Sequence, residues 1–257
     1  MPESVVFDRA AGCYDATRGF PPGVAERVAA LLAEAGALAA RADVLEIGVG
    51  TGRIALPLAA HVRRVVGVDL SAPMLAQLLG KRGGARVHPL RADAAALPFA
   101  SARFDAAVGV HVLHLIPRWR EALAEVERVL RPGGVYLHAA DDQAAGGSLG
   151  FSPHELVRAL GYENAGVSHR KFETCPAEAG FTQVGPVHRI RFARRLAPQA
   201  MLDRMAERSW SITWKMSDAD LARVVERLRA ELLARFGALD REVEIDTGFW
   251  VRAYRPA

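Results

Sequence analysis

The stretch DVLEIGVGTG, at residues 43–52, constrains the fold of this chain more than any other segment. It begins with a short apolar run that is typical of a buried parallel strand. Three glycines follow, and the segment IALPLAA shortly after them predicts the start of a helix. Because glycine carries no Cβ atom, a ligand can approach the backbone closely at such a turn. We therefore expect a ligand site where this strand passes into this helix.

Two charged residues in and beside this stretch indicate which ligand suits it. Glu46 lies inside the strand end, where a carboxylate disfavours an anionic pyrophosphate and suits a cationic or hydroxyl-bearing ligand. Arg53 stands where the GxGxxG pattern of nicotinamide-dependent oxidoreductases has its third glycine. Both residues count against such an oxidoreductase, which we keep as a less favoured alternative.

The composition is that of one globular domain with an insertion or cap. The chain has 257 residues, of which 51% are hydrophobic and 24% are charged, so it can bury a substantial core. We find neither an apolar run of membrane-spanning length nor a secretory leader, and we expect no membrane contact. Cys13 and Cys175 lack metal-ligand spacing, so we expect a reduced, cytoplasmic setting and no metal site.

The charge balance does not point to a nucleic-acid partner. The formal net charge is +4, and the isoelectric point is about 9.4. The arginines are scattered along the chain and interleaved with glutamate and aspartate, however, whereas a nucleic-acid footprint is a clustered basic patch. We therefore do not expect nucleic acid as a direct partner.

Strands and helices alternate downstream of the glycine turn. Further strands are predicted at residues 65–69, 86–90 and 104–110, and at VYLHAAD after an RPGG turn. The segment WREALAEVERVL predicts a helix before that turn. Alternation at this spacing predicts a right-handed, doubly wound, mostly parallel sheet.

Several residues at the strand ends are candidates for ligand contacts. Asp69 follows the glycine turn by about 20 residues, where an acid can accept hydrogen bonds from both hydroxyls of a ribose. Ser71 predicts a helix cap. Met74 can cover an adenine face or pack in the core. Asp93 can accept from an exocyclic amine or cap a turn.

These segments together resemble a class I S-adenosylmethionine-dependent methyltransferase of the type that acts on small molecules, the methyltransferase domain 11 group. The matching segments are VLEIGVGTG, VVGVDLSAPML, RADAAALPF, FDAAVGVHVLHLI and ALAEVERVLRPGGVYL. The resemblance covers a little over half of the chain, from about residue 7 to residue 141. It implies a Rossmann-like, seven-stranded, mostly parallel sheet with a C-terminal antiparallel hairpin, and S-adenosylmethionine as cofactor.

The resemblance also implies roles for matching positions. The methionine part of the cofactor would lie at Glu46 and the glycine turn, the ribose hydroxyls at Asp69, and the methyl group near His111. An N-terminal helical lid, at about residues 1–40, would cover the site and place Arg18 near the cofactor carboxylate. The full set of implied cofactor-binding residues is Tyr14, Arg18, Glu46, Gly48, Gly50, Gly52, Asp69, Leu70, Met74, Asp93, Ala94 and His111.

Direct displacement of the methyl group requires no nucleophile from the protein. A general base is needed only where the acceptor must lose a proton, and imidazole titrates near neutral pH. His111 and His114 are weak candidates for that role, and His169 is a weaker one. For each of them a structural or surface histidine is the alternative interpretation.

The segment after residue 141 resembles the family less. It contains a block of helix formers at about residues 197–238, before a final alternating strand. We interpret residues 1–257 as a single methyltransferase domain in which this block is a helical insertion that forms a cap. Trp210 and Trp214 are four apart, as are Met201 and Met205; they either line an acceptor pocket or form the insertion's own core.

The sequence does not identify the methyl acceptor or the oligomeric state. The fourth strand continues into HVLHLIP, which lacks the Asn/Asp-Pro-Pro-aromatic pattern that resembles amino-methylating nucleic-acid enzymes. The segments that we expect to choose the acceptor are residues 142–169 and 197–237. A non-catalytic module that binds the same cofactor would carry the same motifs and remains an alternative.

Overall fold

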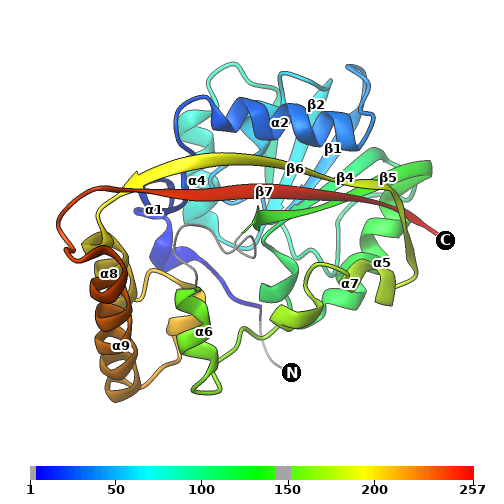
Figure 1. Cartoon of the computed structure of the whole chain (residues 1–257). Coiled ribbons are helices and arrows are strands. Elements are labelled where there is room, and N and C mark those ends of the chain that lie inside the picture. Colours follow the sequence, from blue (N-terminus) through cyan, green and yellow to red (C-terminus); the bar gives the residue numbers. More distant parts are fainter. Residues whose placement is uncertain (1–3, 143–151) are drawn as a thin grey trace. The chain divides into compact units, whose positions relative to one another are not determined.

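The computed structural model describes residues 4–142 and 152–257, which form two compact units. Figure 1 shows the path of the chain through them. The first unit contains Met1–Asp141, Ala165–Ile190 and Phe249–Ala257, and the second contains Asp142–Asn164 and Arg191–Gly248. Within the described part of the chain, no helix is long and apolar enough to cross a membrane.

A seven-stranded sheet in the order β3-β2-β1-β4-β5-β7-β6 runs through the fold. The pairs β1–β2, β1–β4, β2–β3 and β4–β5 are parallel, and the C-terminal strands make the sheet mixed. The predicted Rossmann-like sheet with its C-terminal antiparallel hairpin is therefore confirmed. The strands are β1 (Asp43–Ile47), β2 (Arg64–Asp69), β3 (Val87–Arg91), β4 (Phe104–Val110), β5 (Leu130–Asp142), β6 (Phe181–Leu196) and β7 (Val243–Pro256).

The helices of the first unit connect and cover these strands, with α2 and α5 on opposite faces of the sheet (Figure 1). Ser71 caps α4 as predicted, because its hydroxyl accepts the Met74 N–H at 3.3 Å. The helices are α1 (Tyr14–Arg18), α2 (Val24–Ala35), α3 (Ala55–Leu58), α4 (Ala72–Lys81), α5 (Trp119–Val129) and α7 (Cys175–Glu178), with short 3-10 helices at Asp8–Ala10, Leu113–Leu115 and His169–Lys171.

The RPGG segment differs from the turn predicted before the fifth strand. Phe104 of β4 pairs with Leu130, but Ala106 pairs with Val135. Four residues, 131–134, therefore lie opposite a single residue of β4, as an enlarged bulge inside β5. Gly133, with a φ of +78°, supplies the left-handed conformation that this bulge requires.

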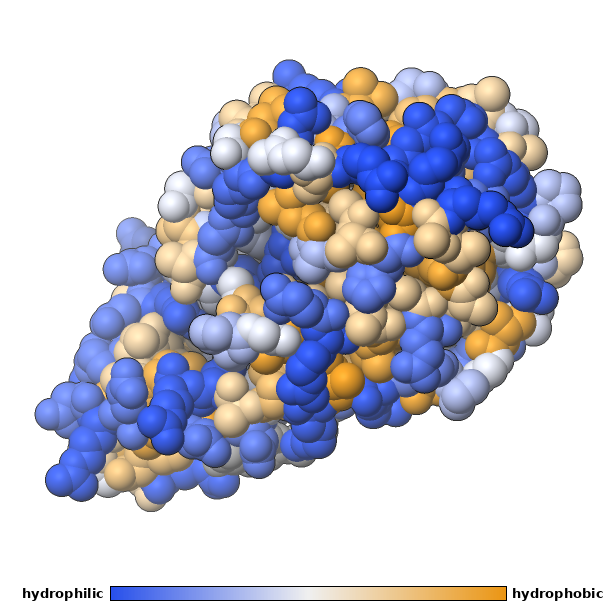
Figure 2. All heavy atoms as spheres, turned by 90° about the horizontal axis from the view of Figure 1, so that it is seen from above, coloured by the Kyte–Doolittle hydropathy of each residue, from blue (hydrophilic) through white to orange (hydrophobic). Residues whose placement is uncertain are grey.

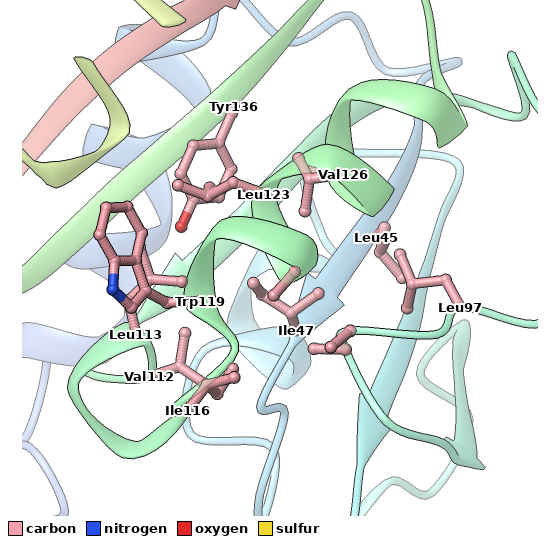
Figure 3. Packing of buried hydrophobic residues seen from close by; sticks show 14 of the residues in the cluster. Leu45, Ile47, Leu97, Val112, Leu113, Ile116, Trp119, Leu123, Val126 and Tyr136 are labelled. Carbon is pink, nitrogen blue, oxygen red and sulfur yellow. The ribbon is translucent and has the colours of Figure 1, made fainter. Parts of the chain in front are cut away.

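One hydrophobic cluster of the first unit lies between the sheet and α5. Figure 3 shows Leu45 and Ile47 of β1 on one side and Leu123 and Val126 of α5 on the other. All four side chains are fully buried, as is Tyr136 of β5. Removal of these apolar side chains from water supplies the main stabilising free energy of the layer formed by the sheet and α5.

The face seen in Figure 2 carries both hydrophilic and apolar side chains. Hydrophilic side chains are interspersed with small apolar areas on the face seen in Figure 2. Among the residues that the structure describes, the large apolar side chains that are exposed come from separate segments, which is normal for a protein surface. They are Val6, Leu79, Leu90 and Leu233.

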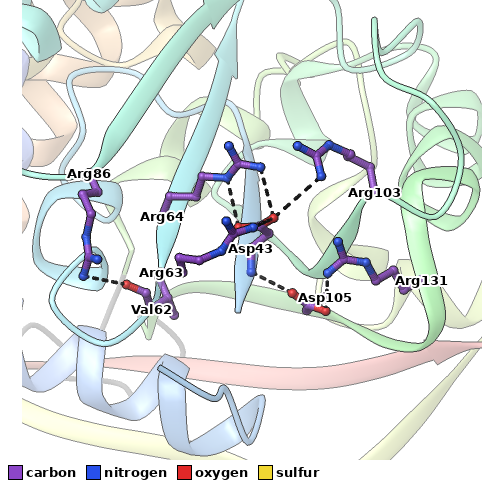
Figure 4. A network of polar contacts seen from close by, with 8 residues as sticks. All are labelled: Asp43, Val62, Arg63, Arg64, Arg86, Arg103, Asp105 and Arg131. Atoms are coloured by element: carbon purple, nitrogen blue, oxygen red, sulfur yellow. Dashed lines mark hydrogen bonds and ion pairs between the residues drawn. The ribbon is translucent and has the colours of Figure 1, made fainter. Parts of the chain in front are cut away.

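A buried carboxylate, Asp43, joins the amino ends of β1 and β2, and a second carboxylate, Asp105, joins β4 to β1 (Figure 4). The Asp43 carboxylate is inaccessible to solvent, pairs with Arg63, and accepts from Arg64 Nε at 2.9 Å. The Asp43 N–H donates to Asp105 Oδ2 at 2.7 Å, and Asp105 pairs with Arg131. Burial alone would raise the pKa of the Asp43 carboxyl, but the hydrogen bonds and charges of Arg64 and Arg63 outweigh it and lower that pKa.

The second unit has its own hydrophobic core, and Trp210, Met201 and Met205 belong to it. Met201, Met205 and Trp210 are buried together with residues of α9. Trp214 is half-buried, and its indole N–H donates to the Arg208 carbonyl oxygen at 2.7 Å. These contacts favour the insertion-core interpretation. The helices of this unit are α6 (Pro153–Arg158), α8 (Pro198–Ala206) and α9 (Asp218–Phe236), with a 3-10 helix at Ser211–Thr213.

We predict that Asp43→Asn lowers the free energy of unfolding at pH 7 by about 2–3 kcal/mol, because two guanidinium groups lose their carboxylate. Urea unfolding followed by circular dichroism measures this. The folded-state pKa of Asp43 is lowered, so its contribution is present above the unfolded-state pKa and is lost as the pH falls. Wild type and variant should converge in acid; a constant difference at all pH values would contradict the assignment.

We predict that Trp210→Ala destabilises the second unit by about 3–5 kcal/mol, because it leaves a cavity among buried methionine and leucine side chains. Thermal unfolding followed by far-ultraviolet circular dichroism measures the loss. Leu233→Ala is the control, since Leu233 lies on the same unit with 42% of its surface exposed and should cost only about 0.5 kcal/mol. Equal, small losses for both variants would show that Trp210 is not a core residue.

Candidate functional site

Polar side chains gather at the carboxyl ends of three neighbouring parallel strands. Glu46 is the second-last residue of β1, His111 follows β4 directly, and Asp141 lies at the end of β5. Arg53, from the turn after β1, connects this group through a salt bridge to Asp141 at 3.4 Å. The carboxyl edge of a doubly wound sheet is where such folds bind ligands.

The glycines of this turn have backbone conformations and close neighbours that leave no room for a side chain. Gly48, Gly50 and Gly52 have φ angles of +70°, +53° and +83°, in the left-handed region that favours glycine. A Cβ atom on Gly48 would lie 2.5 Å from Val112 Cγ2, and one on Gly52 would lie 2.3 Å from Leu78 Cδ1. Both the backbone conformation and the packing therefore require glycine at these two positions.

Glu46 is a buried carboxyl group with an unfilled hydrogen-bonding position. Its side chain is 2% exposed, and Oε2 has no hydrogen-bond partner among residues 4–142 and 152–257. Burial, reinforced by the charge of Asp69, raises its pKa well above the usual range, although Arg53 and a hydrogen bond from the Ala55 backbone oppose this. A cationic ligand beside Oε2 would supply the missing partner.

Arg53 is the cation at the centre of the site. Its Nη1 donates to the Arg18 carbonyl oxygen at 3.0 Å, and its guanidinium lies 4.4 Å from the centroid of the Phe20 ring. Burial alone would lower its pKa, but Asp141, Tyr14 and Glu46 outweigh that effect and raise it. Arg53 therefore remains charged in a partly dry environment.

His111 has an unusual backbone and a defined hydrogen bond. Its φ is +50°, which is rare for a residue with a side chain and recurs at functional sites. The backbone N–H of Asp141 donates to His111 Nε2 at 2.6 Å. The Asp141 carboxylate lies 3.2 Å from the same nitrogen. His114 contacts the ring of Phe172 at 5.2 Å between centroids, and the same ring stacks on His111 at 6.5 Å.

The two other acidic candidates are held by backbone N–H groups. Asp69 accepts from Gly50 and Ser71, each at 2.9 Å, and burial raises its pKa above the ordinary value. Asp93 accepts from the Ala95 N–H at 2.9 Å and pairs with Arg118 at 2.6 Å. The turn-capping role that the sequence allowed for Asp93 is therefore present, while its ligand role stays a prediction.

The N-terminal segment is attached to the loops of this edge by side-chain hydrogen bonds. Asp8 accepts from the Ser71 hydroxyl at 2.6 Å. Asp15 accepts from the Thr51 hydroxyl at 2.6 Å and pairs with Lys81. The segment that carries Tyr14 and Arg18 therefore lies against the glycine turn.

The remaining candidates occupy three different settings. Met74 is buried, and a Cβ atom on Gly50 would lie 3.3 Å from its Cε. Leu70 directly follows β2, and Ala94 lies in the loop after β3. His169 begins a 3-10 helix on another segment.

Sequence reasoning missed Asp141 and the role of Arg53 as its partner. The signal for Asp141 is present, because it ends the apolar run VYLHAA as Asp69 ends VVGV. Nothing in the sequence pairs Asp141 with Arg53, because the two residues are 88 positions apart.

Comparisons with known proteins agree on one family. Residues 45–138 match the family described as Methyltransferase domain. A ubiquinone/menaquinone biosynthesis C-methyltransferase of Syntrophotalea carbinolica is 34% identical over 68% of this chain and 80% of its own length. An uncharacterized methyltransferase of Mycobacterium tuberculosis is 32% identical over 92% of this chain and 88% of its own.

Solved structures share the fold. A putative methyltransferase from Bacillus halodurans covers 89% of this chain and 99% of its own, with a TM-score of 0.61 and 21% identity. A phosphoethanolamine N-methyltransferase of Haemonchus contortus, in complex with S-adenosyl-L-methionine, covers 97% of this chain and 57% of its own, with a TM-score of 0.55 and 21% identity.

We predict that Glu46→Gln stabilises the ligand-free protein increasingly as the pH rises from 5 to 8. A raised folded-state pKa means that stability is greatest below the unfolded-state pKa and falls as the pH rises, and glutamine removes this loss. Urea unfolding at both pH values measures the difference. Glu125→Gln is the matched control of opposite sign, because Arg128 lowers the pKa of Glu125, so this variant should be less stable at pH 8. A pH-independent effect of Glu46→Gln would contradict a neutral Glu46.

Proposed function

Since the chain belongs to the class I S-adenosylmethionine-dependent methyltransferases, we propose that it transfers the methyl group of this cofactor directly to a small-molecule acceptor. The observation that carries the proposal is the vacant hydrogen-bonding position of Glu46 beside the glycine turn. An ammonium group of the methionine part beside Oε2 would favour the ionised form of this carboxyl and pair with it, whereas an anionic group would favour the neutral form and gain no such attraction.

The described residues fit the other parts of the cofactor. Asp69 is already oriented by two backbone N–H groups, and each carboxylate oxygen has further lone-pair capacity for a ribose hydroxyl. We propose that Leu70 and Met74 flank the adenine. Asp93 and the Ala94 backbone would lie at its edge, where Asp93 would keep its present bond to Ala95.

When bound, S-adenosylmethionine supplies a methyl group activated by a sulfonium. The chain's own contribution is then to orient the cofactor, exclude water and hold the acceptor in line with the methyl group. In the proposed arrangement Arg53 and Asp141 fix the end of β5 beside His111. We also propose that residues 1–40 form a lid and that residues 197–238 form a cap.

We predict that Asp69→Asn weakens S-adenosylmethionine binding about 10-fold or more, because a neutral amide replaces the acceptor of two charge-assisted hydrogen bonds. Isothermal titration calorimetry measures the affinity. Asp105→Asn is the control, because Asp105 lies at the opposite, amino end of the strands and should bind the cofactor as wild type does. Unchanged affinity of Asp69→Asn would contradict the assignment of Asp69 to the ribose hydroxyls.

Transfer itself is tested with cofactor labelled in the methyl group and fractions of a metabolite extract, with mass identification of any labelled product. A labelled small molecule would support the proposed activity. Cofactor binding without any product from small-molecule fractions would favour the non-catalytic module. Absence of cofactor binding would rule out both the methyltransferase and the non-catalytic module.

A further inference from the structure

Three imidazoles surround the ring of Phe172 at the carboxyl edge of the sheet. Ring centroids lie 6.5 Å from Phe172 for His111, 5.2 Å for His114 and 4.8 Å for His138. Two of the three have hydrogen bonds that fix which ring nitrogen carries the proton. The protonation pattern of these two rings limits the kind of acceptor that the site can serve.

His138 is unsuited to proton transfer with a ligand. Its side chain is completely buried, and Nε2 lies 2.7 Å from the Phe172 carbonyl oxygen, so that nitrogen carries a proton and donates it. Burial lowers the pKa of His138 to about 4. The ring is therefore neutral, and a ligand cannot reach its unprotonated nitrogen.

His111 has the opposite arrangement. Two groups of Asp141 face Nε2, the backbone N–H at 2.6 Å and the carboxylate at 3.2 Å. The N–H is the closer and points at Nε2, so Nε2 accepts this bond through its lone pair, and the ring proton is on Nδ1. Nδ1 makes no hydrogen bond to the residues that the structure describes, and the side chain is 28% exposed. The site thus offers an N–H donor at this position rather than a base.

A donor beside the reacting atom discriminates between classes of acceptor. A neutral amine has one lone pair, and a hydrogen bond from His111 would occupy the electrons needed for attack. An anionic oxygen has three lone pairs, so it can accept a hydrogen bond and still attack the methyl group. Hydrogen bonding to the charged form also favours ionisation of a weakly acidic acceptor.

We propose that His111 Nδ1–H binds an acidic oxygen of the acceptor, and that the enzyme methylates carboxylates, phenolates or enolates rather than amines. This inference rests on the proposed methyltransferase function. The methyl group is placed on that oxygen, or on a carbon conjugated with it.

The step balances without a base from the protein. An electron pair of the ionised acceptor forms the new bond to the methyl carbon, while the carbon–sulfur pair moves to sulfur and leaves a neutral thioether. The acceptor loses one negative charge and the cofactor loses one positive charge. For transfer to carbon, the hydrogen on that carbon leaves afterwards as a proton to water.

The first test is the tautomer of His111 in protein saturated with S-adenosylhomocysteine. Long-range proton–nitrogen NMR of histidine-labelled protein should show His111 protonated on Nδ1, with assignment from the His111→Phe variant. Protonation on Nε2 would overturn the proposal. Failure to bind S-adenosylhomocysteine would instead count against the proposed function.

The second test uses benzoate and benzylamine as matched probes of opposite charge, added to the same complex. Benzoate should shift the His111 Nδ1 resonance and bind at least about 10-fold more tightly than benzylamine, which is the discrimination of one charge-assisted hydrogen bond. His111→Phe should lose this preference, whereas His88→Phe, at an exposed residue of β3, should keep it. Equal binding of both probes, tighter binding of benzylamine or no shift at His111 would overturn the proposal.

Discussion

The buried guanidinium of Arg53 is the interaction on which the arrangement of the sheet's carboxyl edge depends. It joins the glycine turn to the end of β5 through Asp141 and to the N-terminal segment through the Arg18 carbonyl. Asp141 is the carboxylate that pairs with this charge, and the Phe20 ring faces it. Removal of Asp141 would take away the paired carboxylate of a buried cation that lies beside His111.

The two ends of the parallel strands treat carboxyl groups in opposite ways. At the amino ends, Asp43 and Asp105 meet arginines, their pKa values are lowered, and the charges contribute to stability. At the carboxyl ends, Glu46 and Asp69 are buried without a paired cation of their own, and their pKa values are raised. One end of the sheet is thus satisfied within the chain, while the other retains polar groups that a ligand can satisfy.

Local patterns sufficed to predict much of this molecule. The glycine turn, the Ser71 cap and the alternation of strands depend on neighbours in sequence, and the structure confirms them. The bulge at residues 131–134 was wrongly predicted as a turn, because RPGG supports either and only pairing with β4 decides. The bond between Asp141 and His111 and the placement of Trp210 depend on contacts between distant segments, which a single sequence does not encode in any local pattern.

Because of the bulge in β5, the chain can gain or lose residues at the amino end of this strand without altering the geometry of the carboxyl edge. Pairing resumes at Val135 and continues in register to Ala139, which lies opposite Val110. Insertions or deletions among residues 131–134 can therefore be absorbed where they arise, and related chains can differ there in length at little cost. Between Val135 and Asp141 a shift of one residue would turn every side chain to the other face, so this interval has no freedom in length.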